Sequence, residues 1–378
     1  MGFQLTEEQN AIKSLARDFA TNEIAPFIGK YDERELFPIE IMKKLHEYGL
    51  SNLAIPEQYG GPGIDRVSHA LIIEEISKAC AGVATGLEAN SLSSYPILIG
   101  AREELKQKYL PKLTEEGKFA SFALTEPEAG SDVSSLTTTA KKIDDHYILN
   151  GEKCFITNAS YADFFVVLVK VQNENNEKRF TAFIVDRELN GVTIGEKEKK
   201  LGLRASDTAS VIFEEVNVPA INRIGEEGEG FKIFMKGLIN ARPMVGAQAL
   251  GIAQAAYEAS VSYAKERKQF GQPISKIQAI QFMLANMAME IEASRLLIHK
   301  AVHLLQEGTP SDQHASFAKC FASDTAMKFT TDAVQIFGGY GFIREYPVEK
   351  LFRDAKIMQI YEGTNQIQRV VIAKDILN

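Results

Sequence analysis

The sequence predicts an α+β fold in which a helical domain, an antiparallel β domain and a helical bundle follow one another along the chain. Helical periodicity dominates residues 1–118 and 228–378, whereas short β-rich runs separated by turn residues fill residues 119–227. No GxGxxG follows a strand and no GxxxxGK[ST] occurs, so a doubly wound nucleotide fold is not indicated. We therefore expect three domains with these boundaries.

The first domain should begin with a capped helix. Thr6 and Gln9 have the spacing of a capping box, and apolar residues at helical intervals follow them. Three further helices are predicted, over Pro38–Tyr48, Arg66–Cys80 and Glu103–Leu113. The glycine-rich run Tyr59–Gly63 separates two of them as a loop.

The second domain should consist of strands joined by turns. Five strands are predicted, over Thr137–Ile143, Tyr147–Leu149, Phe164–Val171, Phe180–Val185 and Ala209–Val216. Turn residues such as Asp144-Asp145 and Asn190-Gly191 lie between them, which is typical of an antiparallel sheet or a small barrel.

The third domain should be a bundle of long helices. They are predicted over Gly230–Arg267, Ser275–Gln306, Ser311–Phe337 and a short segment after Gly363. Pro243 predicts a kink in the first helix, and Ser275 with Gln278 predicts a capping box for the second. Gly338-Gly339 should end the third.

Composition narrows the class of protein. A chain of 378 residues that is 45% hydrophobic can bury a large core, and its 50 acidic against 42 basic residues argue against nucleic-acid binding. No apolar run is long enough for a membrane span, and the N-terminus resembles no targeting segment. Three cysteines without CxxC spacing, and only His299 and His303 at i, i+4, indicate neither disulfides nor a metal site. We expect a cytoplasmic protein.

Four motifs contain residues that could support chemistry. Phe122–Asp132 is a polar loop after an apolar strand, Asn150–Asn158 is a strand that ends on an aromatic and a hydroxyl, and Gln335–Phe342 is a helix that runs into three glycines. On spacing alone, an ordinary turn is the favoured explanation of the first motif and sheet packing that of the second, and a glycine helix cap explains the third nearly as well as a ligand site. In Ile360–Arg369, Glu362 precedes a helix in an apolar setting, and burial would make it a usable base, although a structural role is common there.

On these motifs the chain resembles the acyl-CoA dehydrogenases over essentially its whole length. The resemblance rests on TEPEAGSD at Thr125–Asp132, NGEKCFIT at Asn150–Thr157, RKQFG at Arg267–Gly271, and FGGYGF followed by EYPVEKLFRDAKIMQIYEGTNQIQR near the C-terminus. The short-chain butyryl-CoA and medium-chain branches are the most similar in texture.

The resemblance implies a cofactor, a base and partners. FAD would lie between the domains of a homotetramer whose C-terminal domain holds four helices, and an electron-transferring flavoprotein would accept the electrons in fatty acid β-oxidation. Glu362 matches the base that removes the α-proton while the flavin takes the β-hydrogen as hydride, giving trans-2-enoyl-CoA. The acyl-CoA contacts match Ser131, Arg242 and Gly363. The matching flavin contacts, some of which would reach a neighbouring subunit's FAD, are Phe122, Ala123, Leu124, Thr125, Ser131, Phe155, Ile156, Thr157, Arg267, Lys268, Gln269, Gln278, Gln335, Phe337, Gly338, Gly339, Thr364, Asn365 and Gln366.

Some positions depart from the family pattern. Phe155 replaces the usual tryptophan, Glu128 a glycine, Ile239 an aspartate that contacts CoA, and Gln269 a threonine or serine. Ala241 occupies the place of the alternative base of the branched-chain relatives, so Glu362 remains the base.

The acyl chain and the direction of the reaction remain open at this point. Gly86–Leu92 matches the far end of the acyl pocket, where Glu88 is read as a pocket acid or as a solvated helix charge. Straight chains of roughly four to ten carbons are expected from the filling of such a pocket. An enoyl-CoA reductase working in reverse would use the same residues, whereas a flavoprotein retired from catalysis to a binding role would normally lose Glu362.

Overall fold

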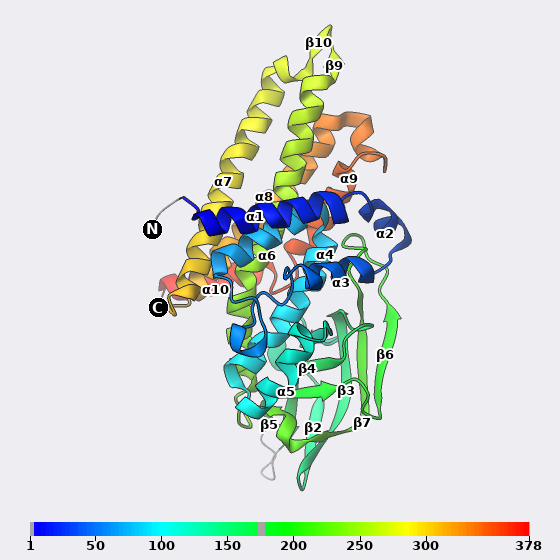
Figure 1. Ribbon diagram of the computed structural model, residues 1–378, viewed down its shortest axis with the longest axis vertical. Coiled ribbons are helices and arrows are strands. Elements are labelled where there is room, and N and C mark those ends of the chain that lie inside the picture. The colour runs from blue at the N-terminus through cyan, green and yellow to red at the C-terminus, as the bar shows by residue number, and fades with distance from the viewer. Residues whose placement is uncertain (1–3, 173–177, 378) are drawn as a thin grey trace.

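Three stretches of different secondary structure follow one another in the computed structural model, which describes residues 4–172 and 178–377 (Figure 1). Helices α1 to α5 are followed by strands β1 to β8, and then by helices α6 to α10 around a small hairpin of β9 and β10. The predicted α+β class is confirmed.

The N-terminal helices surround one long buried helix. They are α1 (Glu7–Phe19), α2 (Ile28–Arg34), α3 (Ile39–Glu47), α4 (Arg66–Gly100) and α5 (Glu103–Thr114), with a π-helical turn over Ala20–Ile24. The capping box of α1 is confirmed, since Thr6 Oγ1 accepts from the Gln9 N–H and the Thr6 N–H donates to Gln9 Oε1, both at 3.1 Å. The start of this domain is therefore specified locally.

Helix α4 is longer than predicted. Its backbone leaves helical geometry at Cys80 (φ −159°, ψ 109°), where the predicted helix ends, but the helix resumes and continues to Gly100. Residues 80–91 are buried on every side, so this half has no amphipathic stripe whose periodicity could mark it as a helix.

An eight-stranded sheet forms the middle of the chain. Its strands are β1 (Ala120–Ala123), β2 (Thr139–Ile143), β3 (His146–Thr157), β4 (Phe164–Gln172), β5 (Lys178–Asp186), β6 (Val192–Lys197), β7 (Thr208–Pro219) and β8 (Arg223–Ile224). The order is β6-β7-β3-β2-β4-β5-β8, with β1 beside β4. Most pairs are antiparallel as predicted, whereas β4 pairs in parallel with both β1 and β2. These two parallel pairs join segments that the chain reaches by crossing over, which local turn signals do not reveal.

The C-terminal helices build an elongated arm and a bundle (Figure 1). They are α6 (Gly230–Glu266), α7 (Gln278–Gln306), α8 (Asp312–Phe337), α9 (Val348–Met358) and α10 (Asn365–Leu377), and β9 (Lys268–Gln269) pairs with β10 (Gln272–Pro273) at the tip. Helix α6 runs continuously through Pro243. Helix α8 ends at Gly338, which has a positive φ of 62°, as predicted.

The capping box predicted at Ser275 is wrong. Ser275 lies in a short 3₁₀ turn over Ile274–Lys276, and the residue that caps α7 is Ile277, which has no side-chain cap. The Ile277 N–H donates to the Ile274 carbonyl, so the turn moves Ser275 away from the N-cap position.

The core is continuous between the two helical parts. One apolar cluster joins α1, α3 and α4 to α6, α7, α8 and α9, and a second lies within the β-sheet. The three cysteines, Cys80, Cys154 and Cys320, are free and buried. Within residues 4–172 and 178–377, no helix is long and apolar enough to cross a membrane, and no three His, Cys, Asp or Glu residues group as metal ligands.

Candidate active site

The first component of the site is the loop between α9 and α10, which carries Glu362. Glu362 and Gly363 both have left-handed backbone angles, with φ of 57° and 89°. Glycine adopts this conformation freely, whereas a glutamate is strained in it, at a cost of about 1–2 kcal/mol. Neighbouring contacts must therefore hold the turn in place.

Glu362 has the environment of a proton acceptor. Its Oε2 atom is buried and has no hydrogen-bond partner among the described residues. Burial raises the pKa of the Glu362 carboxyl to about 7. The positive charges of Arg242 and Lys319 lower this pKa, and the negative charge of Glu88 raises it. A carboxylate with such a pKa takes up a proton readily near neutral pH.

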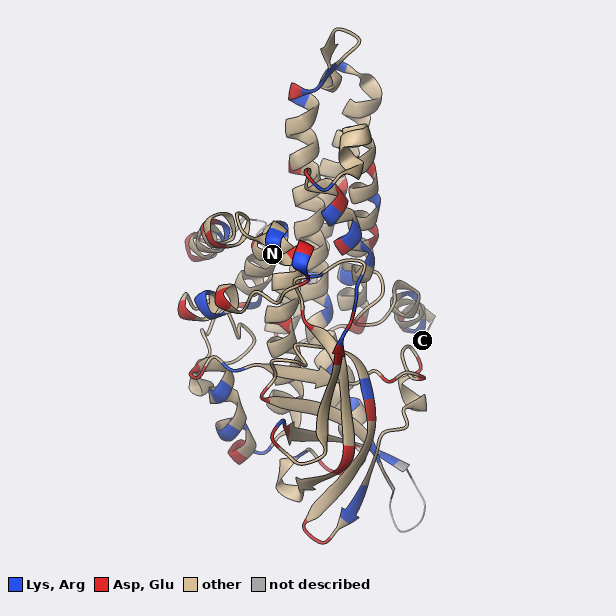
Figure 2. Ribbon diagram, turned by 90° about the vertical axis from the view of Figure 1, so that its right-hand side faces the viewer, with Lys and Arg blue, Asp and Glu red and all other residues tan. Residues whose placement is uncertain are grey.

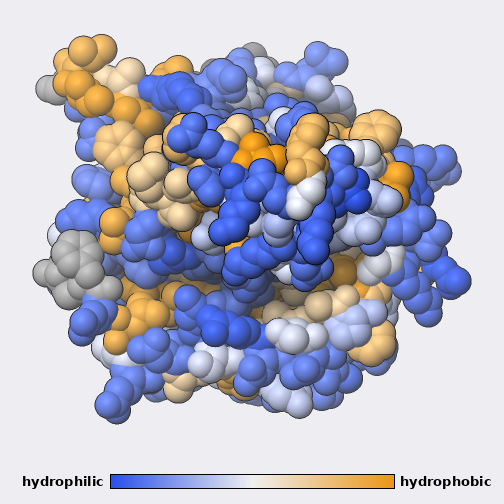
Figure 3. All heavy atoms as spheres, turned by 90° about the horizontal axis from the view of Figure 1, so that it is seen from above, coloured by the Kyte–Doolittle hydropathy of each residue, from blue (hydrophilic) through white to orange (hydrophobic). Residues whose placement is uncertain are grey.

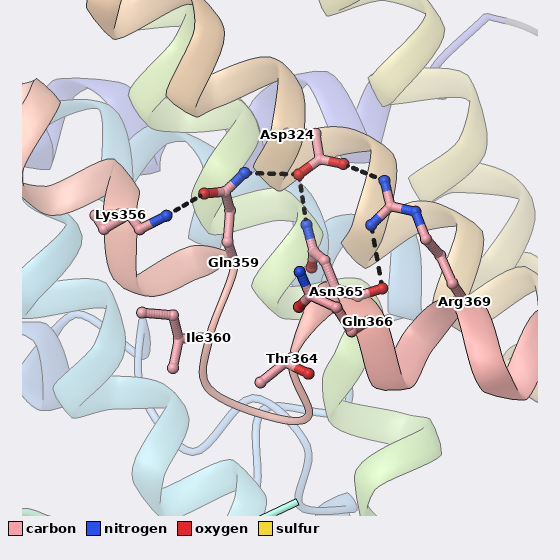
Figure 4. Close-up of a pocket in the computed structure, with 8 residues that line it drawn as sticks. All are labelled: Asp324, Lys356, Gln359, Ile360, Thr364, Asn365, Gln366 and Arg369. Atoms are coloured by element: carbon pink, nitrogen blue, oxygen red, sulfur yellow. Dashed lines mark hydrogen bonds and ion pairs between the residues drawn. The ribbon is translucent and has the colours of Figure 1, made fainter.

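Helix α8 holds this loop from both sides. On the inner side, the Lys319 ammonium donates to the Gly363 carbonyl at 2.9 Å and to Asn365 Oδ1 at 2.7 Å. On the outer side, Asp324 accepts hydrogen bonds from Gln359, Asn365 and Arg369 (Figure 4). The loop is thereby fixed to one helix at both of its ends.

The outer side borders a cavity of about 660 Å³, in which predicted flavin contacts gather (Figure 4). Its lining consists of Asp324, Lys356, Gln359, Ile360, Thr364, Asn365, Gln366 and Arg369. Thr364, Asn365 and Gln366 are thus brought together, but the Asn365 side chain already binds Lys319, Ser323 and Asp324. In this chain the Asn365 amide is committed to holding the loop.

The second component is the loop that follows β1, residues 124–132, which we call the Thr125 loop. Phe122 and Ala123 end the strand, where Phe122 packs against Phe234 with ring centroids 4.5 Å apart. Leu124 and Thr125 follow, and the Thr125 carbonyl accepts from the Cys154 N–H at 2.9 Å. This bond places the predicted flavin loop directly beside β3.

A buried ion pair fixes the same loop. The Lys153 ammonium lies 2.7 Å from Glu126 Oε1 and donates to the Leu124 carbonyl at 3.1 Å. Burial favours the neutral acid, but the Lys153 charge lowers the pKa of Glu126 to about 2. The Thr137 hydroxyl and the Thr138 backbone N–H also donate hydrogen bonds to this carboxylate. The loop is therefore anchored through a carboxylate that stays charged.

A bulge in β3 turns one aromatic ring outward. The pairing of β3 with β7 shifts register between Lys153 and Ile156, and Phe155 has a φ of 57° and is 64% exposed. Ile156 is buried in the sheet core, so only its backbone can contact a ligand, and Thr157 is half-buried at the end of the strand. Phe155 thus offers an uncovered ring beside the Thr125 loop.

The remaining predicted flavin contacts lie elsewhere, at the tip of the arm (Figure 1). Arg267, Lys268 and Gln269 precede the β9–β10 turn, and Gln278 begins α7, all of them exposed. Gln335, Phe337, Gly338 and Gly339 end α8 on the same side, since Phe337 stacks on Tyr263 near the end of α6 with centroids 4.0 Å apart. Within one chain these residues do not meet the Thr125 loop.

The predicted substrate contacts fall in three places. Ser131 is exposed in the Thr125 loop, and Gly363 adjoins Glu362. Arg242 is buried in α6, where its Nη1 lies 3.1 Å from Asp312 Oδ1 and its Nε has no partner among the described residues. A buried guanidinium with a free donor, whose charge also acts on Glu362, can serve an oxygen-rich ligand.

Sequence reasoning missed the supporting residues. Lys153 lies inside one of the sequence motifs, but no role was assigned to it. Lys319 was not singled out, and neither was His69, whose Nε2 lies 2.7 Å from Glu88 Oε1. A signal existed for Lys319, because Ala315, Ser316, Ala322 and Ser323 surround it at helical spacing with small side chains. Such a face leaves room for a long side chain to turn inward.

Comparisons with known proteins cover the chain from its first helix to its last. Family models of the acyl-CoA dehydrogenase N-terminal, middle and C-terminal domains match residues 6–117, 121–216 and 228–377. The acyl-CoA dehydrogenase, short-chain specific, of Clostridium acetobutylicum is 44% identical over 377 residues, 100% of both chains.

Two solved structures are similar throughout. Butyryl-CoA dehydrogenase from Megasphaera elsdenii has a TM-score of 0.97 and 45% identity, and each chain is covered to 100%. A chain in the structure of the electron transferring flavoprotein of Acidaminococcus fermentans has a TM-score of 0.97 and 47% identity, again with 100% coverage of both chains.

Proposed function

Because this chain belongs to the acyl-CoA dehydrogenase family of FAD-dependent oxidoreductases, we propose that it converts a short- to medium-chain acyl-CoA thioester to trans-2-enoyl-CoA, with Glu362 as the base. The observation that carries the proposal is the Glu362 carboxyl, whose Oε2 is buried without a partner and whose pKa is raised by burial to about 7. A general base of this kind suits the removal of a weakly acidic proton.

The residues present fit FAD. Gly130 in the Thr125 loop is exposed and has no heavy atom within 4 Å of an added Cβ, so a planar group can approach the backbone there. The uncovered Phe155 ring lies beside this loop and offers a stacking surface. A flavin held by these residues would supply a hydride acceptor for the β-hydrogen of the substrate.

The chain's own groups divide the remaining work. Glu362 Oε2 takes the α-proton, and Arg242 and Lys319 provide the positive charge that favours its carboxylate form. Among the described residues, none accepts a hydrogen bond from the Glu362 N–H. This donor is therefore free to hold the thioester oxygen, on which negative charge develops as the proton leaves.

The proposed substrate range follows from α4. Gly86, Leu87 and Glu88 are buried, and the Glu88–His69 pair supplies a polar end to the acyl site. Each buried methylene contributes about 0.8 kcal/mol, nearly fourfold, so kcat/KM should rise with chain length until the site is filled and then fall. We expect the maximum on straight chains of roughly four to ten carbons, and a maximum on branched or aromatic acyl groups would overturn this range.

The proposed assembly is a homotetramer. Helix α7 carries no charged residue between Lys276 and Glu290, and the upper part of the arm is largely uncharged (Figure 2). Phe270, Phe282 and Met289 are exposed on it, and hydrophobic patches interrupt the surface seen from above (Figure 3). This surface supports association, and the family resemblance implies four copies, which native mass spectrometry should find; flavin contacts at the tip would then face a neighbouring chain.

An electron-transferring flavoprotein is the proposed acceptor. The similarity to a chain in the electron transferring flavoprotein structure of Acidaminococcus fermentans supports it. The reduced protein should pass its electrons to such a partner quickly and to oxygen slowly, and rapid peroxide formation at turnover would contradict this.

The test of the reaction is Glu362→Gln, which keeps the shape of the side chain and removes the base. The variant should retain FAD, but butyryl-CoA should bleach its flavin about 10²–10⁴-fold more slowly. An unchanged rate would mean that the base is another residue. Net conversion of butenoyl-CoA to butyryl-CoA, with reduced electron-transferring flavoprotein as the electron donor, would show that the protein works in the reductase direction.

A further inference from the structure

Lys319 is a lysine whose surroundings call for an explanation. Its side chain is 0% exposed, and both oxygens that it contacts, the Gly363 carbonyl and Asn365 Oδ1, are neutral. In the part of the chain that the structure describes, no carboxylate forms an ion pair with it. Burying an ammonium without a counter-ion is costly, so a residue of this kind is retained for something other than stability.

We propose that Lys319 is a positioning residue for the base: its buried ammonium holds the left-handed turn at Glu362 and favours the ionised form of that carboxyl. The inference rests on the proposed role of Glu362. Lys319 itself need not touch the substrate, because it acts through the Gly363 carbonyl and through its charge.

Hydrogen bonds from two helices hold the turn at Glu362 and Gly363. The Gly363 carbonyl accepts from Lys319 and, at 3.0 Å, from Gln368, which also donates to the Glu362 carbonyl at 3.1 Å. Two adjacent peptides in left-handed geometry are thus held by three donated hydrogen bonds from α8 and α10. Among the described residues, removal of Lys319 leaves Gln368 as the one side chain that donates to these two carbonyls.

Charged groups from three helices act on Glu362. Arg242 approaches from α6, Lys319 from α8 and Glu88 from α4, where His69 contacts it. Arg242 is already paired with Asp312 at 3.1 Å, whereas no carboxylate of the described residues pairs with Lys319. Around Lys319 itself lie Cys320, Asp324 and Arg242. The charge of Lys319 is therefore the less compensated of the two that stabilise the carboxylate.

The experiment measures the pH dependence of flavin reduction by butyryl-CoA under anaerobic conditions, at low substrate concentration. Lys319→Gln keeps a donor and loses the charge, and Lys319→Met loses both. We expect the midpoint to move up by about one pH unit in both variants, and the plateau rate to fall about tenfold in Lys319→Met alone. Lys319→Arg restores the charge and should return the midpoint to that of the wild type.

A control and a second readout separate this role from a structural one. Lys328→Met removes an exposed charge from the same helix, where Lys328 pairs with Glu290, and should leave the midpoint unchanged. Amide hydrogen exchange of residues 359–368 should be faster in Lys319→Met than in the wild type and in Lys328→Met, because the loop loses an anchor.

The outcomes are distinguishable. A wild-type flavin that butyryl-CoA does not bleach contradicts the proposed function, whereas a bleached wild type with equal midpoints in Lys319→Gln and Lys319→Arg overturns the inference. Where Lys319→Met does not accumulate as folded protein, the Gln and Arg variants still differ in charge and decide the question. Unchanged exchange of residues 359–368 in a folded Lys319→Met variant would also overturn it.

Discussion

Two loops of the candidate active site are each held by a buried lysine, but the surroundings of the two lysines differ. Lys153 lies 2.7 Å from the Glu126 carboxylate, so its charge is neutralised on the spot. Lys319 contacts only neutral oxygens in the loop of Glu362. Burial lowers the pKa of both ammonium groups to about 8. Both lysines fix a loop, but only the charge of Lys319, which no carboxylate pairs among the described residues, is left to act on a neighbouring carboxyl as well.

The largest effect should follow from breaking the pair in the Thr125 loop. Lys153→Met leaves the Glu126 carboxylate buried without its partner, and such a change costs about 3–5 kcal/mol. We expect that loss in the free energy of unfolding, measured in urea, together with a fall in FAD content. Lys142→Met is the control, because Lys142 is half-exposed and its contact with Glu227 is 3.8 Å long. Full stability and full FAD content in Lys153→Met would contradict the role given to the pair.

Neutralising the two carboxyls should have opposite effects on stability. The pKa of Glu362 is raised in the folded state, so the wild type loses stability as pH rises from the unfolded value towards 7. Glu362→Gln escapes this loss and should be about 2–3 kcal/mol more stable at pH 8, but less than about 1 kcal/mol more stable at pH 5. Glu126→Gln should be less stable at pH 7, since the pKa of Glu126 is lowered to about 2 and its charge supports the fold above that. Urea titrations measure both changes in the free energy of unfolding, and changes of the same sign in the two variants would contradict the prediction.

Activity and cofactor retention should differ in their pH dependence. Because Glu362 must be ionised to take a proton, kcat/KM should rise about tenfold per pH unit below pH 6 and level off above pH 8, around a midpoint near 7. FAD retention should stay flat between pH 5 and 7, because Glu126 remains charged throughout. Steady-state assays and flavin absorbance after gel filtration measure the two profiles, and a flat kcat/KM would remove Glu362 as the titrating base.

The smallest effect separates two neighbouring threonines. Thr137 Oγ1 donates to Glu126 Oε2 at 2.8 Å, so Thr137→Val should cost about 1 kcal/mol. The Thr138 hydroxyl is buried without a partner among the described residues, so Thr138→Val should be neutral or slightly stabilising. Urea denaturation of both variants measures the difference, and each variant is the control for the other. Equal losses in the free energy of unfolding would show that the hydrogen bond from the Thr137 hydroxyl to Glu126 does not contribute.

Local signals predicted the parts of the fold that local residues decide. The Thr6 capping box and the end of α8 at Gly338 are confirmed, because hydrogen bonds within four residues determine them. The second half of α4 escaped prediction because burial on all sides removes the periodicity. The parallel pairing of β4 with β1 and β2 depends on a crossover that no short segment encodes.

The site shows the same division. The family motif brought Glu362 into view, but its pKa depends on its burial and on the charges of Arg242, Lys319 and Glu88, which come from three other helices. Likewise, the sequence left Glu88 between a pocket acid and a solvated charge, and its contact with His69 across 19 residues settles that it is buried. Contacts between distant elements, not the motif itself, set the chemistry of the carboxyl.

The three buried cysteines lie where their labelling can report on local opening of the structure. Cys154 follows Lys153 and donates its N–H to the Thr125 loop, and the sulfur of Cys320, next to Lys319, lies 3.9 Å from the Asn365 carbonyl. Burial raises the pKa of both thiols, so each should resist alkylation until its surroundings open. The protein thus carries one native chemical reporter per loop. Timed labelling read by mass spectrometry would rank the opening rates of the two loops, with Cys80 at the break in α4 as an internal clock for the core.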